Sequence, residues 1–419
     1  MHRKLLDSAT DALGQVLKFE QPADSVLSNY FKQHHALGQS ERAFIAESVF
    51  GVLRHKRVLD ALTETGTARA LLLGWLARHS QTPVRDLAPL VKPAEAEALP
   101  RLAAAETGDL PLPIRAELPD WVCERLSRRL SDLELLALGS ALQQPGPLDL
   151  RVNTVMGDRN SALRTLAATD LPAEPCRYSP IGIRVTGKPA INRHPLFLKG
   201  AVEVQDEGSQ LVGYLLAPRR HDLVVDFCAG AGGKSLMLGA MMSSQGRVYA
   251  FDVSPGRLSR LKPRLKRSGL SNLHPHLLRN ESDPKVKRLA GKIDRVLVDA
   301  PCSGLGTLRR NPDLKWRQTP ESVAELRLKQ AAILGAASTL VKPGGRLVYA
   351  TCSLLTEENE EIIASFLANH SDFTPLNCES LLNQHDIHID TGEQLRLWPH
   401  LHGTDGFFAA ALERRRLTG

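Results

Sequence analysis

The chain has 419 residues, of which 42% are hydrophobic and 24% charged, the composition of a soluble globular protein. This length predicts two or three domains rather than one. No apolar stretch approaches the roughly 20 residues that a membrane span requires. The basic N-terminus is not followed by the apolar segment of a signal peptide, so we expect a cytoplasmic protein without membrane association.

The first hundred residues lack glycine-rich turns and predict helices. In Ser40–Ala61 the apolar residues recur at the spacing of a core-facing helix, with Ser40 as its expected N-cap. Lys92–Pro113 is rich in Ala, Glu and Pro and predicts a linker or irregular connection.

A small mixed region is expected next. Pro119–Leu130 has a helical pattern, and Leu148–Thr154 alternates as a strand does. Thr169–Pro195 is interrupted by Pro and Gly and predicts short strands and turns.

From about residue 200 apolar strands alternate with helices, which predicts a parallel sheet with right-handed crossovers. Ligands of such sheets bind at the carboxyl ends of the strands. The predicted strands are Leu223–Phe227, Arg247–Phe251, Arg295–Val298 and Arg346–Ala350. We therefore expect three domains, at residues 1–110, 111–200 and 201–419.

A glycine-rich turn follows the first of these strands, in the motif LVVDFCAGAGGKS. Gly230, Gly232 and Gly233 permit tight backbone geometry and the close approach of a ligand. A phosphate-binding P-loop would need glycine at Cys228, and a dinucleotide-binding GxGxxG motif would need it at Ser235. Both are excluded, and a purely structural turn between strand and helix stays open.

Acidic residues end the later strands. Asp252 ends the second strand, where a carboxylate can accept hydrogen bonds from both ribose hydroxyls of an adenosine cofactor. A third strand is expected to end near Leu277–Glu281, and the next ends at Asp299. A glycine turn with acids at successive strand ends favours S-adenosylmethionine as the cofactor.

Two cysteines also follow strands, Cys302 in the motif DAPCSG and Cys352 in YATCS. A single cysteine is more often a small buried hydrophobic residue than a nucleophile. A pair beside a cofactor turn suits cytosine-5 methylation, in which one thiolate adds to carbon 6 and makes carbon 5 nucleophilic. A carboxyl group such as Asp299 would hydrogen-bond ring nitrogen 3, and the second thiol would assist removal of the carbon 5 hydrogen.

The remaining cysteines give no sign of other chemistry. The chain contains no CxxC pair and no histidine at ligand spacing from a cysteine, which favours free thiols over disulfides and predicts no metal site. All six cysteines are Cys123, Cys176, Cys228, Cys302, Cys352 and Cys378.

The motifs VDFCAGAGGKS, VDAPCSGLGTLRRNPDLKW and LVYATCS together resemble the Sun family of RNA cytosine-5 methyltransferases, in its bacterial 16S ribosomal RNA type. The segment ERAFIAESVFGVLRHKRVLDAL resembles the NusB-like RNA-binding domain of that subgroup. The resemblance implies a Rossmann-like α/β methyltransferase domain that depends on adenosylmethionine. An all-helical NusB-like domain and a small α/β region are expected to precede it.

The resemblance also implies roles for individual residues. Cys352 corresponds to the nucleophile and Cys302 to the cysteine that assists product release. Ala231 stands where the family commonly has proline, and Asn280 stands where the family has an acid. The implied cofactor positions are Cys228, Ala229, Gly230, Ala231, Gly232, Gly233, Lys234, Asp252, Asn280 and Asp299.

The charge of +7 points to the same partner. Between Pro255 and Arg295 twelve Lys or Arg residues stand against three acids. Such a run is often a solvated helix face, but it also suits a polyanion whose phosphates it neutralises. A second basic cluster beside the thiol motif favours the polyanion: Arg309, Arg310, Lys315 and Arg317.

We therefore expect a monomeric enzyme whose partner is RNA, most simply small-subunit ribosomal RNA. One alternative is a catalytically silent RNA-binding scaffold. Others are a cytosine-5 methyltransferase acting on tRNA or on DNA, and in the DNA case Cys302 would be the nucleophile.

Overall fold

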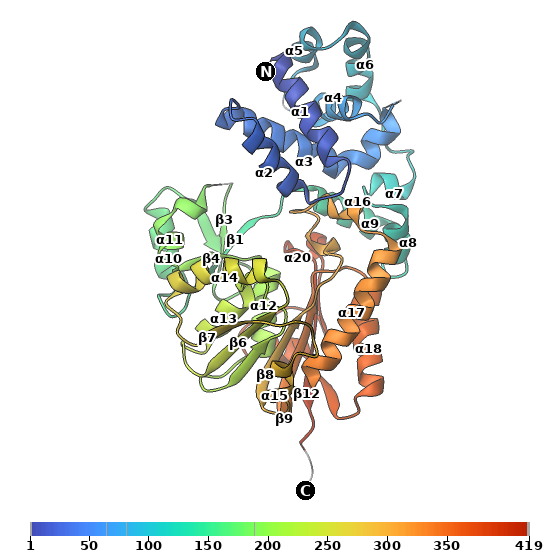
Figure 1. Ribbon diagram of the computed structural model, residues 1–419. Helices are drawn as coiled ribbons and strands as arrows, with labels where there is room; N and C mark the ends of the chain where they lie inside the picture. Colours follow the sequence, from blue (N-terminus) through green and yellow to red (C-terminus); the bar gives the residue numbers. More distant parts are fainter. Residues whose placement is uncertain (1, 64, 81, 188, 417–419) are drawn as a thin grey trace. The chain divides into compact units, whose positions relative to one another are not determined.

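The computed structural model divides into two compact units (Figure 1), each of which is described by itself. The first comprises Met1–Pro145 and Thr307–Pro320, and the second comprises Gly146–Gly306 and Glu321–Gly419. The residues that the structure describes are 2–63, 65–80, 82–187 and 189–416. Within these ranges, none of the helices is both long and apolar enough to cross a membrane.

The first unit is helical, as the sequence predicts. Its central helix α3 (Gln39–Leu62) contacts both α1 (Arg3–Val16) and α4 (Ala68–His79), and the three bury a common apolar core. The other helices are α2 (Ala23–Gln33), α5 (Val84–Leu87), η1 (Ala88–Leu90), α6 (Pro93–Ala104), α7 (Leu112–Arg115), α8 (Asp120–Ser127), α9 (Asp132–Gln143) and α16 (Leu314–Arg317).

Two local predictions in this unit are wrong. The N-cap of α3 is Gly38 rather than Ser40, because the Glu41 carboxylate accepts a hydrogen bond from the Gly38 amide at 2.8 Å and closes the first turn there. The predicted linker at Lys92–Pro113 contains α6. Proline at the first helical position is compatible with a helix start, and the alanines and glutamates that follow are strong helix formers.

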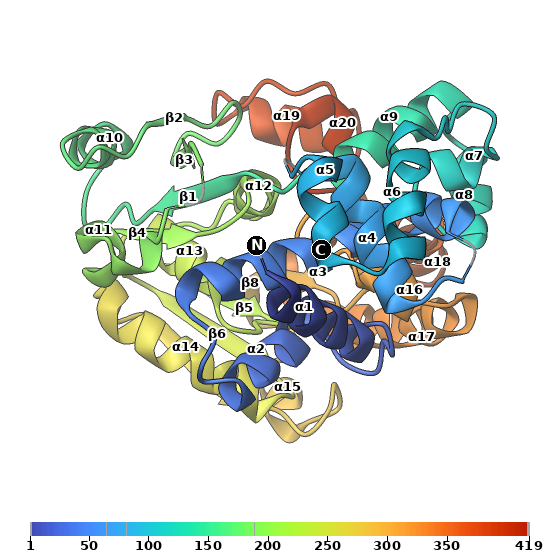
Figure 2. The ribbon, with the colours of Figure 1, turned by 90° about the horizontal axis from the view of Figure 1, so that it is seen from above.

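The second unit begins with a small antiparallel sheet in the order β2-β3-β1-β4. Strand β1 (Leu148–Val152) and the short strands β2 (Ala173–Pro175) and β3 (Gly182–Val185) confirm the predicted pattern. Figure 2 shows helices α10 and α11 beside this sheet. The remaining elements are α10 (Arg159–Ala167), η2 (Ile191–Arg193), α11 (Pro195–Leu198) and β4 (Val202–Val204).

The larger sheet has the order β10-β12-β9-β8-β5-β6-β7, with β11 paired to β12. Its five strands from β9 to β7 are parallel, which confirms the predicted Rossmann-like α/β class. The antiparallel strands β10, β11 and β12 were not predicted. The strands are β5 (Leu223–Asp226), β6 (Arg247–Asp252), β7 (Leu273–Leu277), β8 (Ile293–Asp299), β9 (Val341–Thr351), β10 (Phe373–Leu376), β11 (Leu395–Leu397) and β12 (Phe407–Arg414).

Helices cover both faces of this sheet because its strands alternate between two apolar cores. Val224 faces one core and Val225 the other, as successive strand residues must. Helices α12, α13, α14 and α19 pack in the first core, and α17 and α18 pack in the second (Figure 1). The helices and short turns of this unit are α12 (Glu207–Leu216), α13 (Gly233–Met241), α14 (Pro255–Ser268), α15 (Pro284–Arg288), η3 (Leu305–Thr307), α17 (Pro320–Ser338), η4 (Thr356–Glu358), α18 (Glu360–Asn369), α19 (Cys378–Asn383) and α20 (Pro399–His402).

The strand order places the predicted site. From β5 the chain continues to β6 and β7 on one side of the sheet and then to β8 and β9 on the other. The order reverses between β5 and β8, the point at which ligands of open α/β sheets bind. The loops after β5, β6, β8 and β9 therefore leave the same edge of the sheet.

Candidate active site

The turn after β5 requires glycine at two positions. Gly230 has a φ of +57° and donates its amide hydrogen bond to Asp252 at 2.8 Å. Gly232 has a φ of +81°, and a Cβ there would lie 2.1 Å from Cδ1 of Leu261. No heavy atom beyond its chain neighbours lies within 4 Å of a Cβ built at Gly230, so a ligand can approach the backbone there.

Ala231, which stands where the resembled family commonly has proline, is held from outside the turn. Its carbonyl accepts a hydrogen bond from Arg264 of α14 at 2.7 Å. Arg264 also donates to the buried Glu203 at 2.8 and 3.0 Å. This clamp was not predicted, because in the sequence Arg264 is one cation among many in a basic run.

Asp252 ends β6 beside this turn. One carboxylate oxygen accepts from Gly230, and the other accepts from the Ser254 amide at 2.7 Å. A carboxylate offers about four acceptor sites, so two more hydrogen bonds, such as those from ribose hydroxyls, can be accommodated. The geometry therefore fits the predicted contact with an adenosine cofactor.

Asn280 follows β7, two residues after Leu278, whose amide donates to the Asp252 carbonyl at 3.0 Å. Asn280 is exposed, three residues beyond the end of β7, and its side-chain oxygen accepts from the Ser282 amide at 3.0 Å. In the described part of the chain, no hydrogen bond joins Asn280 to the glycine turn or to Asp252. Its observed contact is the local turn of an Asx motif.

Lys234 and Asp299 form an ion pair at the ends of the turn and of β8. The distance from Nζ to the carboxylate is 2.7 Å, and the Lys234 side chain is 10% exposed. Burial lowers the pKa of Lys234, but Asp299, with a smaller contribution from charge on Cys352, raises that pKa above its usual value. Lys234 therefore stays protonated at neutral pH and places a positive charge beside Asp299.

The two predicted cysteines lie together. Their sulfur atoms are 3.4 Å apart, a hydrogen-bond contact between free thiols rather than a disulfide. The hydrogen bond to Cys352, together with burial, raises the pKa of Cys302 well above its usual range. Cys302 therefore keeps its hydrogen at neutral pH and is placed to donate it to the sulfur of Cys352.

A buried carboxylate, Glu358, joins the two cysteine loops. It accepts hydrogen bonds from the amide and hydroxyl of Ser303 at 2.8 and 2.5 Å, from the hydroxyl of Ser353, and from Gln330 at 2.9 Å. Each serine directly follows one of the cysteines. Glu358 was not predicted, although the repeated Cys-Ser dipeptide is a signal that both loops share a partner.

Two further polar groups lie at the end of β5. Burial raises the pKa of Asp226 to about 7, although Ser235 donates to its carboxylate at 2.6 Å. Burial also raises the pKa of Cys228 well above its usual value. Burial therefore disfavours the charged form of both groups, which makes Cys228 a poorer nucleophile than an exposed thiol.

One cluster elsewhere has the composition of a metal site. The ligand atoms of Asp149, Cys176 and Glu207 lie within 4.8 Å of one another, all buried. Arg184 donates to both oxygens of Asp149 at 2.8 and 2.9 Å and lies 3.6 Å from Glu207. The guanidinium occupies the position of a cation, so the cluster is an internal ion pair.

Comparison with known proteins identifies the family. Residues 213–413 match the model of the 16S rRNA methyltransferase RsmB/F, and residues 118–192 match the RsmF/B-like ferredoxin-like domain. The chain is 35% identical to a probable ribosomal RNA small subunit methyltransferase B of Synechocystis sp., over 91% of this chain and 93% of the relative. It is 33% identical to ribosomal RNA small subunit methyltransferase B of Sodalis glossinidius, over 88% and 90% of the two chains.

Solved structures share the fold of this chain. PH0851 superposes with a TM-score of 0.80 at 26% identity and covers 99% of both chains. NSun6 from Pyrococcus horikoshii, solved with the adenosylmethionine analogue SFG, superposes with a TM-score of 0.63 at 21% identity and shares the fold over 71% of this chain and 98% of its own. The chain thus belongs to the RsmB/F family of S-adenosylmethionine-dependent rRNA methyltransferases, the Sun-type family that its cysteine motifs resemble.

Proposed function

We propose that this protein methylates carbon 5 of a cytosine in 16S ribosomal RNA through a covalent thiolate adduct. The observation that carries the proposal is the contact of 3.4 Å between Cys302 and Cys352 beside the Lys234–Asp299 ion pair. The family and the names of the relatives support 16S ribosomal RNA as the substrate.

The thiol contact supports different roles for the two sulfurs. Cys352 attacks carbon 6 of the base, because the ammonium of Lys234 and the thiol of Cys302 both favour negative charge at its sulfur during the reaction. The second oxygen of Asp299, which has no partner among the described residues, accepts a hydrogen bond from ring nitrogen 3 once that nitrogen has taken a proton from water as the adduct forms. For release, water takes the carbon 5 hydrogen as a proton, the ring double bond re-forms, and the bond between carbon 6 and Cys352 breaks with its electron pair returning to the sulfur. Cys302 assists this step by offering its hydrogen to the departing sulfur of Cys352.

The turn at Cys228–Lys234 and Asp252 would hold the cofactor. The open backbone at Gly230 and the acceptor capacity of Asp252 fit an adenosine group. S-adenosylmethionine supplies the methyl group when it is bound. The target base must leave its stack to reach the sulfurs, since carbon 6 is inaccessible within a helix.

The test is product analysis. Unmethylated 16S ribosomal RNA, free tRNA and a DNA oligonucleotide are each incubated with the protein and the methyl-labelled cofactor, and the nucleosides are separated after digestion. We expect label in 5-methylcytidine from the 16S RNA alone. Label in another nucleoside would refute the carbon 5 chemistry, label in tRNA or DNA would refute the substrate, and RNA binding without label would favour a scaffold.

Helix α14 supports RNA as the partner and yields a separate prediction. Its exposed cations have no acidic partner in the described part of the chain. Replacing Arg260 or Lys262 by glutamine should each reduce the slope of log Kd against log salt by about 0.7 to 1, because one phosphate contact is lost. The exposed cations are Arg257, Arg260, Lys262 and Lys266.

This slope is measured with a 16S RNA fragment at several potassium chloride concentrations. Lys342→Gln is the control, because Lys342 stands near the start of β9, at the opposite end of the strand from Cys352. An unchanged slope in both α14 variants would remove α14 from the RNA surface. An equal change in the control would show a charge effect that is not specific to α14.

A further inference from the structure

The segment that follows the Cys302 loop folds as part of the helical unit. Thr307–Pro320 belongs to that unit, where Trp316 packs against the apolar core. The segment contains the second basic cluster, for which the sequence predicts contact with phosphates. That prediction is wrong for two of its four residues. Arg309 is 6% exposed and Lys315 is 4% exposed, so neither is available to a phosphate on the surface.

A kink in α3 creates the binding site for this segment. His55 has non-helical φ and ψ of −106° and 16°. In a regular helix the carbonyls of Leu53 and Arg54 would accept from the amides of Arg57 and Val58. Side chains outside α3 pair with the four freed groups. The amides of Arg57 and Val58 donate to Glu117 at 2.9 and 3.0 Å. The Leu53 carbonyl accepts from Trp316 Nε1 at 3.3 Å, and the Arg54 carbonyl accepts from Lys315 Nζ at 2.9 Å.

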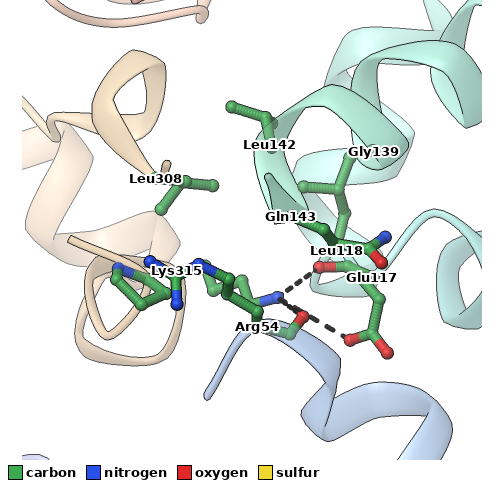
Figure 3. Close-up of a pocket in the computed structure, with 9 residues that line it drawn as sticks. Arg54, Glu117, Leu118, Gly139, Leu142, Gln143, Leu308 and Lys315 are labelled. Carbon is green, nitrogen blue, oxygen red and sulfur yellow. Dashed lines mark hydrogen bonds and ion pairs between the residues drawn. The ribbon is translucent and has the colours of Figure 1, made fainter. Parts of the chain in front are cut away.

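Lys315 is the centre of this arrangement (Figure 3). Its Nζ also donates to the Glu117 carbonyl at 2.8 Å and lies 3.7 Å from the Glu117 carboxylate, which is itself buried. The surrounding cavity, of about 10 Å³, is at the lower limit for one water molecule. Solvent therefore cannot take over the hydrogen bonds of the ammonium without a rearrangement.

The other end of the segment is tied to the thiol pair. The Gly306 amide donates to the Cys352 carbonyl at 2.9 Å, and the Gly306 carbonyl accepts from Gly406 at 2.8 Å. A Cβ at Gly306 would lie 2.2 Å from the Gly406 carbonyl oxygen. Only Thr307 separates Gly306 from Leu308, which is 2% exposed and lines the cavity beside Lys315.

We infer that Thr307–Pro320 is a tether through which the helical unit positions both cysteine loops, with Lys315 as the positioning residue. Hydrogen bonds fix the chain at Lys315 and Trp316 and again at Gly306. A displacement of Lys315 is therefore passed to Gly306 through the short chain between them. The consequence for catalysis rests on the proposed function, since that function assigns chemistry to Cys302 and Cys352.

The first test measures thiol reactivity in the full chain and needs no RNA. Wild type and Lys315→Met are treated with iodoacetamide, and alkylation of each cysteine is followed by peptide mass spectrometry. We expect Cys302 and Cys352 to react roughly tenfold faster in the variant, because the hydrogen bonds of a charged donor no longer hold the tether. Buried Cys378 is the internal reference and should not change.

The control is Leu6→Ala, which opens the same helical core at a residue whose side chain makes no hydrogen bond to the tether. It should lower the thermal midpoint of the protein as Lys315→Met does, yet leave the alkylation of Cys302 and Cys352 unchanged. Equal alkylation rates in the two variants would reduce Lys315 to a structural role and overturn the inference. Unchanged rates in Lys315→Met would overturn it as well.

Methyl transfer provides a second readout. Lys315→Met should lower kcat at least tenfold with cofactor affinity unchanged, whereas Leu6→Ala should stay within twofold of wild type. If Lys315→Met does not fold, Trp316→Phe removes the hydrogen bond to Leu53 and one ring of the indole but keeps Lys315, and it should shift alkylation in the same direction by less. A wild type without methyl transfer would refute the proposed function but leave the alkylation result standing.

Discussion

Replacing Cys352 by alanine is expected to abolish methyl transfer, by at least about a thousandfold, because no other group then supplies the attacking sulfur. The variant should also form no denaturation-resistant adduct with 16S RNA. Cys302→Ala should behave differently, since attack still occurs while release is impaired, and the adduct should accumulate. Both are measured by labelled methyl transfer and by denaturing electrophoresis of protein incubated with RNA and cofactor.

Cys378→Ala is the matched control for these thiol variants. Its sulfur is buried in α19 and hydrogen-bonds to the Ala409 carbonyl at 3.8 Å rather than to either cysteine loop, so methyl transfer should persist while the fold is checked by thermal unfolding. An adduct in Cys352→Ala that is missing in Cys302→Ala would transfer the nucleophile role to Cys302. That result would also favour the alternative of a cytosine-5 methyltransferase acting on DNA, in which Cys302 is the nucleophile.

Glu358→Ala should be the most destabilising single change at the site. Four donors, on Ser303, Ser353 and Gln330, would lose a buried acceptor, and the expected cost is about 3–5 kcal/mol in the free energy of unfolding. Methyl transfer should fall as well, because Ser303 and Ser353 hold the loops of both thiols. Urea unfolding and kcat measured on the same preparations check the two effects.

Glu361→Gln provides the comparison for Glu358. It is a nearby glutamate whose ion pair with Arg327, at 2.8 Å, is exposed. Loss of a surface pair of this kind changes stability by about 1 kcal/mol or less. If Glu358→Ala were no more destabilising than Glu361→Gln, the carboxylate would not hold the two loops together.

The catalytic sheet could be predicted well because its signals are local. The parallel strands other than β7 contain a short apolar run followed by a turn, and Asp252, Asp299 and both cysteines occur where such runs end. The carboxyl ends of parallel strands share one edge, so the convergence of these residues followed from topology alone. Which sulfur attacks did not follow from topology, because both cysteines follow strands at the same edge; the resemblance to the Sun family assigns that role to Cys352.

The partners of the site were missed for a different reason. Glu358 and Arg264 act through contacts made across the fold, and nothing in their sequence neighbourhood distinguishes them from surface charges. Lys315 was assigned to a surface because basic residues are rarely buried. The kink at His55 that buries it is a property of the folded chain. The C-terminal strands were missed because β12, which reads FFAAALER, lies between neighbours and lacks alternation.

The tether also orders events during synthesis. Domains commonly fold as units while the chain emerges, the N-terminal one first. Here the carbonyls freed at the kink of α3 have no donors until Lys315 and Trp316 have left the ribosome. The N-terminal helices can close their own core, whose buried residues run from Leu5 to Leu99, but the apolar surface that Trp316 covers stays exposed while much of the catalytic sheet is translated. A nascent chain of this kind is a natural client for chaperones that cover exposed apolar surface.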